Sequence, residues 1–192
     1  MKLDLIKLYI EYHIETTRRV WDVIEQISED QFLANTIYSH GSIRNLMVHL
    51  TSVERRWLAG LKNQEDVPHL NEEEYDSIAK AREIFELISK DLGDYVLGLT
   101  EDEINQSTDK LSEPRWQVLL HLINHGTDHR STVLQKLNEL GAPTFEQDFI
   151  LWLWNRKKIN KFTKKYFNQN KIVTRSKERI NDQTQIHKPL IS

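Results

Sequence analysis

The sequence predicts an all-α protein: a four-helix bundle with a short fifth helix and a basic C-terminal tail. Apolar residues recur at three- and four-residue steps over four long stretches, which is the period of a helix with one buried face. No stretch alternates apolar and polar residues over the length of a half-buried strand. Capping residues and Gly or Pro stop signals separate the four stretches. Four amphipathic helices joined by moderate connections bury their apolar faces most simply against one another.

The first helix is expected over residues 4–27 and the second over residues 43–62. The residues between them, 29–41, are expected to form a loop or short turn that ends at Gly41. Ser42 then has the position of an N-cap, because its hydroxyl can accept a hydrogen bond from a free N–H of the first helical turn. The second helix carries a single apolar stripe, made of Ile43, Leu46, Met47, Leu50, Val53, Trp57 and Leu61.

The third and fourth helices complete the bundle. The third is expected over residues 72–98 with Asn71 as its N-cap, and three glutamates fill its first turn, where the helix dipole favours negative charge. The fourth begins after Ser112 and runs to about Leu140, where a glycine and then a proline end it. The apolar stretch 145–154 predicts a short fifth helix packed on the bundle.

Length and composition predict one globular domain over residues 1–154, followed by a basic extension over 155–192. The chain has 192 residues, of which 39% are hydrophobic and 29% charged, as in an ordinary globular protein. No stretch approaches the roughly 18 apolar residues that span a bilayer, and the N-terminus lacks a signal-peptide pattern. We therefore expect a cytoplasmic protein.

Charge is distributed unevenly along the chain. Residues 1–154 hold 15 Lys and Arg against 27 acids, whereas residues 155–192 hold 11 Lys and Arg against 2 acids. An acidic main domain argues against nucleic-acid binding there, since neutralising phosphates requires a basic face. The basic tail is expected to contact an acidic surface, either the body of this protein, with a disordered end beyond it, or a membrane or partner.

Three histidines stand at four-residue intervals in the fourth helix: His121, His125 and His129. A helical wheel places His129 inside the apolar stripe, His125 at its edge and His121 outside it. Two neutral imidazoles one turn apart can hold one metal ion if a third ligand arrives from elsewhere. His49, on the flank of the second helix's apolar stripe, is the candidate third ligand.

A structural interpretation of the histidines stays open beside the metal site, because buried histidines often only bond a neighbour. No Glu lies in the fourth-helix motif, which argues against an HExxH metalloprotease. The remaining histidines are interpreted as solvated or structural: His13, His40, His69 and His187. The chain has no cysteine, so a metal must be bound by nitrogen and oxygen, and any thiol must come from outside the protein.

Two segments together resemble a known family. The segment HLINHGTDHR, followed by LNELGAP and DF, resembles the C-terminal signature of the DinB family of damage-inducible proteins, which includes bacillithiol S-transferase-like members. IRNLMVHLTSVERRWLAGL resembles the second-helix signature of that family, a His followed by an acid and a Trp. The likeness covers about residues 1–154. One departure is visible: the family commonly has Gly-Gln where this chain has Ser131-Thr132.

The resemblance implies a four-helix bundle that holds a divalent metal on His49, His125 and His129, and it implies a homodimer. It also implies a metal-dependent thiol S-transferase, which joins a low-molecular-weight thiol to a small electrophile. Zn, Ni, Mn or Fe would suit such a site. Asp128, Glu54 and Asn124 are candidates to orient the imidazoles, or are plain surface and capping residues.

Two alternatives to the transferase are kept. The same metal site would support hydrolysis, with water as the nucleophile. A non-catalytic metal- or ligand-binding stress protein would use the site for structure or sensing. The catalytic residues and the pocket for the electrophile stay unassigned by the sequence.

Overall fold

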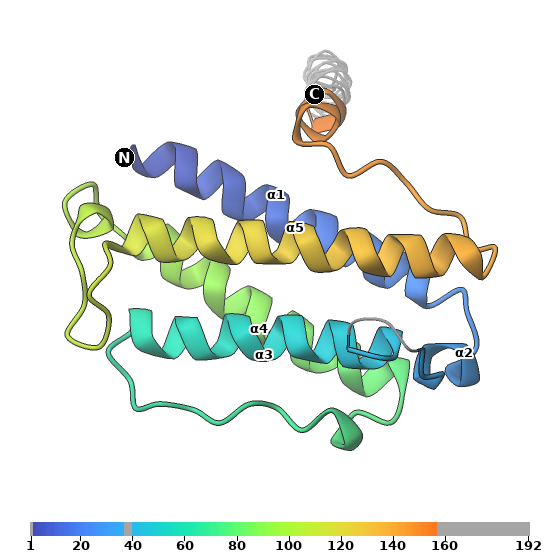
Figure 1. Ribbon diagram of the computed structural model, residues 1–192. Helices are drawn as coiled ribbons and strands as arrows, with labels where there is room; N and C mark the ends of the chain where they lie inside the picture. Colours follow the sequence, from blue (N-terminus) through green and yellow to red (C-terminus); the bar gives the residue numbers. More distant parts are fainter. Residues whose placement is uncertain (1, 37–39, 157–192) are drawn as a thin grey trace, which may run out of the picture. The chain divides into compact units, whose positions relative to one another are not determined.

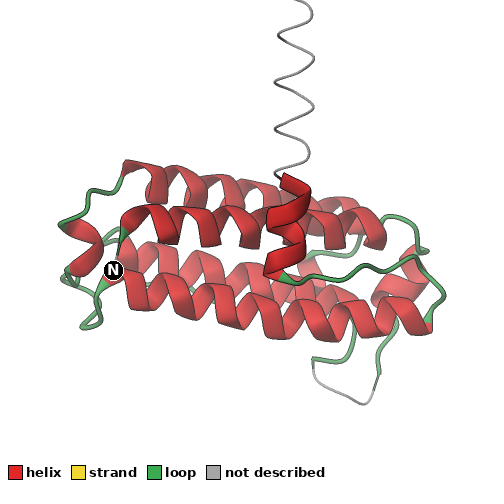
Figure 2. Ribbon diagram, turned by 90° about the horizontal axis from the view of Figure 1, so that it is seen from above, coloured by secondary structure: helices red, strands yellow, loops and turns green. Residues whose placement is uncertain are grey.

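The computed structural model describes residues 2–36 and 40–156, which belong to two compact units, Met1–Phe145 and Glu146–Ser192 (Figure 1). The prediction of an all-α protein is confirmed, since the described residues contain helices and no strand (Figure 2). No helix within these ranges is both long and apolar enough to cross a membrane. The predicted basic extension falls, apart from residues 155 and 156, outside the described residues.

Four long helices build the first unit: α1 (Leu3–Ile24), α3 (Ile43–Leu61), α4 (Ile78–Gly98) and α5 (Arg115–Glu139). Helices α1 and α3 each pack against both α4 and α5, so the order around the bundle is α1, α5, α3, α4. In Figure 1, α1 and α5 run in one direction and α3 and α4 in the other. The first half of α3 therefore lies beside the second half of α5, and this antiparallel pair carries the predicted metal ligands.

Large apolar side chains fill the bundle at its α2 end. Trp21 of α1 is fully buried and packs with Phe85 of α4 and Phe32, at ring-centroid distances of 5.9 and 6.2 Å. Burying an aromatic side chain of this size stabilises the fold by about 1.5–3 kcal/mol. Phe32 lies on a short helix, α2 (Glu29–Leu33), within the segment predicted as a loop or short turn. A capping box, formed by Ser28 and Gln31, closes this helix at its start.

The third helix begins later than predicted. Residues Glu72–Glu74 form a single 3-10 turn capped by Asn71, and α4 begins only at Ile78. The Ser77 hydroxyl accepts a hydrogen bond from the backbone N–H of Lys80, and the Glu29 carboxylate accepts one from that of Ile78. Two free N–H groups at the start of α4 are thus satisfied, which makes Ser77 the better N-cap.

The start of α3 was predicted correctly. Ser42 is fully buried, and its hydroxyl accepts a hydrogen bond of 3.0 Å from the backbone N–H of Asn45. We expect Ser42→Ala to lower the free energy of unfolding by about 1 kcal/mol, because this N–H would lose its partner in a buried position. Urea unfolding followed by circular dichroism measures the change. Ser42→Gly, which keeps the capping backbone accessible, is expected to lower the free energy of unfolding by only a few tenths of a kcal/mol.

The predicted fifth helix exists in the second unit, where residues 149–156 are helical. Within it Phe149 stacks on Trp152 at 5.8 Å, and the Arg156 guanidinium lies 5.3 Å from the Trp152 ring. Phe145, the predicted start of this helix, belongs to the first unit instead. Its ring packs against the core and lies under the guanidinium of Arg19, 3.9 Å from it.

Candidate metal centre

The three predicted ligands come together between α3 and α5. The His49 ring centroid lies 5.4 Å from that of His125 and 5.1 Å from that of His129. His125 and His129 have centroids 4.3 Å apart, and their Nε2 atoms are 2.9 Å apart. Two nitrogens that each bind one ion at about 2.0–2.1 Å stand about 2.9–3.4 Å apart, so this pair already has the spacing of two ligands. The helical wheel is confirmed too: His129 is buried, His125 half-buried and His121 exposed.

A fourth imidazole, that of His40, belongs to the same cluster. Its ring stacks on His49 at 4.1 Å and meets the His129 ring edge-on at 5.4 Å. Nitrogen atoms of His40, His49 and His129 all lie within 4.8 Å of one another, a set that contains His40 in place of the predicted ligand His125. His40 is exposed, as expected of a solvated residue, but nothing in the sequence indicated that its ring lies among the clustered imidazoles. No helical spacing connects it with His49, because it lies in the connection before α3, and only the folded chain brings the two rings together.

The other histidines of the described chain lie around or behind the cluster. His121 packs edge-on against Trp57 at 5.3 Å, and its centroid is 5.8 Å from that of His125. His69 is held through both ring nitrogens, by Ser52 and by Arg56, and lies parallel to His49 at 6.5 Å. These bonds confirm a structural role for His69. His187 lies outside the described residues.

The surroundings of His49, His125 and His129 disfavour protonation of these three imidazoles. Burial, reinforced by the neighbouring imidazoles of His40 and His129, lowers the pKa of His49 to about 4. Burial, followed by the charges that His129 and His49 would carry, lowers the pKa of His125 to about 3. The pKa of His129 is lowered by burial and by His40, while Asp128 opposes that shift. At neutral pH these imidazoles are therefore neutral, which is the form that binds metal.

One nitrogen of the cluster is buried without any hydrogen-bond partner, Nδ1 of His125. The contact between the Nε2 atoms of His125 and His129 needs one of them to donate and the other to accept. Whichever of the two rings donates this proton, Nδ1 of His125 still has no hydrogen-bond partner. A group of close, neutral, incompletely bonded imidazoles fits the donor set of a divalent transition metal.

The lowered pKa values predict that stability depends on pH in the chelator-treated protein. The unfolded chain takes up protons on these imidazoles below about pH 6.5, whereas the folded protein does so only near pH 3–4. Between pH 7.5 and pH 5 we expect the free energy of unfolding to fall by about 2 kcal/mol. This is roughly half of what the full shifts of His49 and His125 would give, because both rings keep some contact with water. Urea unfolding at each pH measures the change, and His49→Gln should flatten the dependence.

Behind the cluster lies a buried polar network on α1, α3 and α5. Nε2 of His13 lies 2.8 Å from the Glu54 carboxylate, and Arg130 donates from Nη1 to Nδ1 of His13 at 2.9 Å. Since Arg130 can only donate, His13 must carry its proton on Nε2 and donate it to Glu54. Glu54 and Arg130 are 1% and 0% exposed. The network therefore connects His13 and Glu54 with the residue directly after His129.

This network changes the role expected for Glu54, which with Asp128 and Asn124 was a candidate to orient the imidazoles. Glu54 bonds to His13 and to none of the clustered rings, and its second carboxylate oxygen has no partner. Asp128 and Asn124 are exposed, and only the charge of Asp128 reaches His129. The hydroxyls of Ser131 and Thr132, at the departure from the family pattern, donate hydrogen bonds to carbonyls of their own helix, and neither residue is buried.

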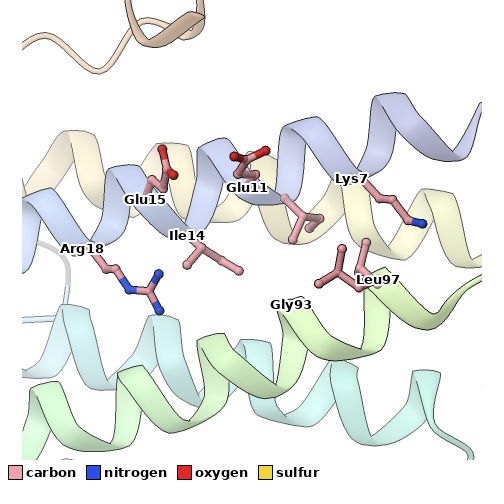
Figure 3. Close-up of a pocket in the computed structure, with 9 residues that line it drawn as sticks. Lys7, Glu11, Ile14, Glu15, Arg18, Gly93 and Leu97 are labelled. Atoms are coloured by element: carbon pink, nitrogen blue, oxygen red, sulfur yellow. The ribbon is translucent and has the colours of Figure 1, made fainter. Parts of the chain in front are cut away.

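A cavity in the first unit is lined in part by α3, the helix that carries His49. It has a volume of about 190 Å³, and its walls include Val53, one turn along α3 from His49, and Trp57, which contacts His121. A larger cavity of about 410 Å³ lies between α1 and α4, the pair on the opposite side of the bundle (Figure 3). Charged side chains such as Glu11 and Glu15 line its rim, and none of the clustered histidines reaches it. None of the clustered histidines lines the smaller cavity either, but its Val53 and Trp57 walls lie on α3, the helix that carries His49.

Comparison with known proteins supports the family likeness. The model of the DinB family matches residues 1–165, which is 11 residues beyond the end predicted for the main domain. No curated protein matches the chain.

Proposed function

The chain belongs to the DinB family, and from this premise we propose that it is a divalent-metal-dependent thiol S-transferase. His49, His125 and His129 would hold the metal. The convergence of these three neutral imidazoles, from two helices, is the observation that carries the proposal. The substrates would be a low-molecular-weight thiol and a small electrophile.

The donor set favours a reactive centre. A divalent cation on three neutral ligands keeps its full charge, and when bound it would supply the positive charge that lowers the pKa of a thiol. The described part of the chain places no carboxylate among the ligands, and the whole chain has no cysteine to compete with an incoming thiol.

The protein side chains would bind and place the second substrate. Trp57 and Val53 offer an apolar wall about one to two helical turns along α3 from His49. Charged side chains line the same cavity beside this wall: Arg56, Asp66 and Lys110. An activated aryl halide held there would be attacked at its halogen-bearing carbon by the sulfur of the deprotonated thiol. The carbon–sulfur bond forms first, the carbon–halogen bond then breaks, the halide leaves with the bonding pair, and the proton of the thiol passes to water.

A non-catalytic metal protein is the second candidate, and His40 favours it. A fourth imidazole in the cluster would close the coordination of a tetrahedral ion, and closed sites with four protein ligands are typical of structural metals. A hydrolase working with water at the same centre requires an open position, as the transferase does.

Two assays separate these functions. Full-length protein loaded with Zn²⁺, Ni²⁺ or Mn²⁺ is mixed with 2-mercaptoethanol and 1-chloro-2,4-dinitrobenzene, and the thioether product is followed by its absorbance. We expect conjugation above the uncatalysed rate with at least one metal, and its loss in His125→Ala. Conjugation absent with every metal, despite stoichiometric binding, would reject the transferase and favour the non-catalytic candidate. Hydrolysis of p-nitrophenyl acetate, lost in the same variant, would favour the hydrolase.

A further inference from the structure

We propose that His40 is a displaceable fourth ligand of the metal centre, which occupies the coordination position that a thiol substrate must take. This inference rests on the proposed function for the identity of the displacing molecule. It makes His40 a residue that sets the affinity for the substrate, rather than part of the permanent metal cage.

The position of the His40 ring carries the first step. Its centroid is only 4.1 Å from that of His49 and 5.4 Å from that of His129, and one nitrogen of each ring lies within 4.8 Å of the others. His129 is in turn joined to His125 through Nε2. An ion bound to the helical histidines would therefore have the His40 imidazole within reach as a further nitrogen ligand.

The backbone around His40 is held in place, although the His40 side chain itself is exposed. The His40 carbonyl accepts a hydrogen bond of 2.9 Å from the side-chain amide of Asn45 on α3. The next carbonyl, that of Gly41, accepts hydrogen bonds from Thr36 and from Lys136 on α5. Gly41 has φ of +88°, a conformation that favours glycine. Both helices that carry the other ligands thus fix the backbone from which His40 projects.

His40 is nevertheless the ligand that can leave at the lowest cost. The other three imidazoles project from the middle of α3 and α5, where moving a ring out of the cluster would disturb a packed helix. His40 lies in the connection before α3, and its side chain can change rotamer without breaking the bonds made by its carbonyl. Centres with four protein ligands are closed, whereas catalytic ones keep one position open. If His40 left the ion, the closed centre with four protein ligands would become a centre with one open position.

If His40 competes with the thiol, the apparent affinity for the thiol is the intrinsic affinity multiplied by the fraction of molecules in which the position is open. If His40 occupies the position in about nine molecules of ten, removing it should tighten thiol binding about tenfold. The three helical ligands remain, so the metal itself should stay bound.

Full-length protein loaded with Co²⁺ tests the inference, because the visible absorption of the ion reports its coordination. His40→Ala and His40→Gln are compared with wild type and with His121→Ala, which removes an exposed imidazole beside the cluster that lies outside the proposed ligand set. Each protein is titrated with 2-mercaptoethanol and, separately, with free imidazole. We expect both His40 variants to keep Co²⁺, to show an altered spectrum, to regain the wild-type spectrum with imidazole, and to bind the thiol about tenfold more tightly. His121→Ala should behave as wild type.

Several outcomes would overturn the inference. A spectrum unchanged by both substitutions at His40 would mean that this ring is not a ligand, and loss of Co²⁺ as complete as in His49→Ala would make it part of the permanent cage. Equal thiol affinity in the variants and wild type would remove the competition. If the spectrum changes and imidazole reverses it, but no protein binds the thiol, His40 is confirmed as a ligand while the proposed thiol chemistry and the competition both fail.

Discussion

Replacing His125 and His129 together by alanine is expected to lower the affinity for Zn²⁺ by at least about 100-fold, which is the upper end of what losing a mere supporting residue costs. The two Nε2 atoms stand 2.9 Å apart on one rigid helix, so the substitution removes the best-arranged pair of donors in the cluster. Isothermal titration of the chelator-treated protein with Zn²⁺ measures the affinity, and elemental analysis of untagged protein shows which metal is acquired in the cell.

The matched control is His121→Ala, which removes an imidazole one turn from His125 on the exposed side of α5. Its Zn²⁺ affinity should stay within about twofold of wild type, since exposed sites away from the ligands tolerate substitution. The double variant should also fold. It loses two imidazoles whose hydrogen bonds are incomplete and keeps the apolar core. Zn²⁺ binding in the double variant at wild-type affinity would place the metal elsewhere and remove the basis of the transferase.

Gly126→Ala is expected to destabilise the fold by about 3 kcal/mol, the upper part of the range for overpacking a core. A Cβ at this position would stand 2.2 Å from Cε1 and 2.6 Å from Nδ1 of His13. The His13 ring cannot move aside, because Glu54 and Arg130 hold its two nitrogens in a fully buried site. Moving it would leave buried charges without their partners, which is costly. Urea unfolding followed by circular dichroism measures the difference.

Gly93→Ala is the matched control in the interior of α4. There a Cβ would meet only the Cδ1 atom of Ile14, at 3.7 Å, which is an ordinary contact in the groove of Figure 3. We expect this variant to be more stable than wild type by about 0.5–1 kcal/mol, because alanine favours a helix interior over glycine. If both variants shift stability equally, the packing of His13 against α5 is not the reason for glycine at position 126.

The fourth-helix motif illustrates how far local patterns reach. Its spacing identified His125 and His129, because a helix puts every fourth residue on one face whatever surrounds it. The glycine and arginine of the same motif could not be explained from the string. Gly126 makes room for His13, and Arg130 bonds to it, yet His13 lies more than a hundred residues earlier in the chain. For residues 72–77 the local pattern gave the wrong helix start. Asn71 and Ser77 are both good N-caps, and the sequence alone does not show which of them begins the long helix.

Periodicity, capping residues and composition were enough to determine the helical class, the four long helices, the lack of cysteine ligands and three of the clustered histidines. These features depend on contacts between neighbours in sequence, or on a face that one helix presents. The tertiary structure alone decided that α3 runs antiparallel to α5, that Glu54 serves His13 instead of the metal centre, and that His40 joins the cluster. Each of these rests on contacts between distant segments, for which a single sequence carries no spacing to read.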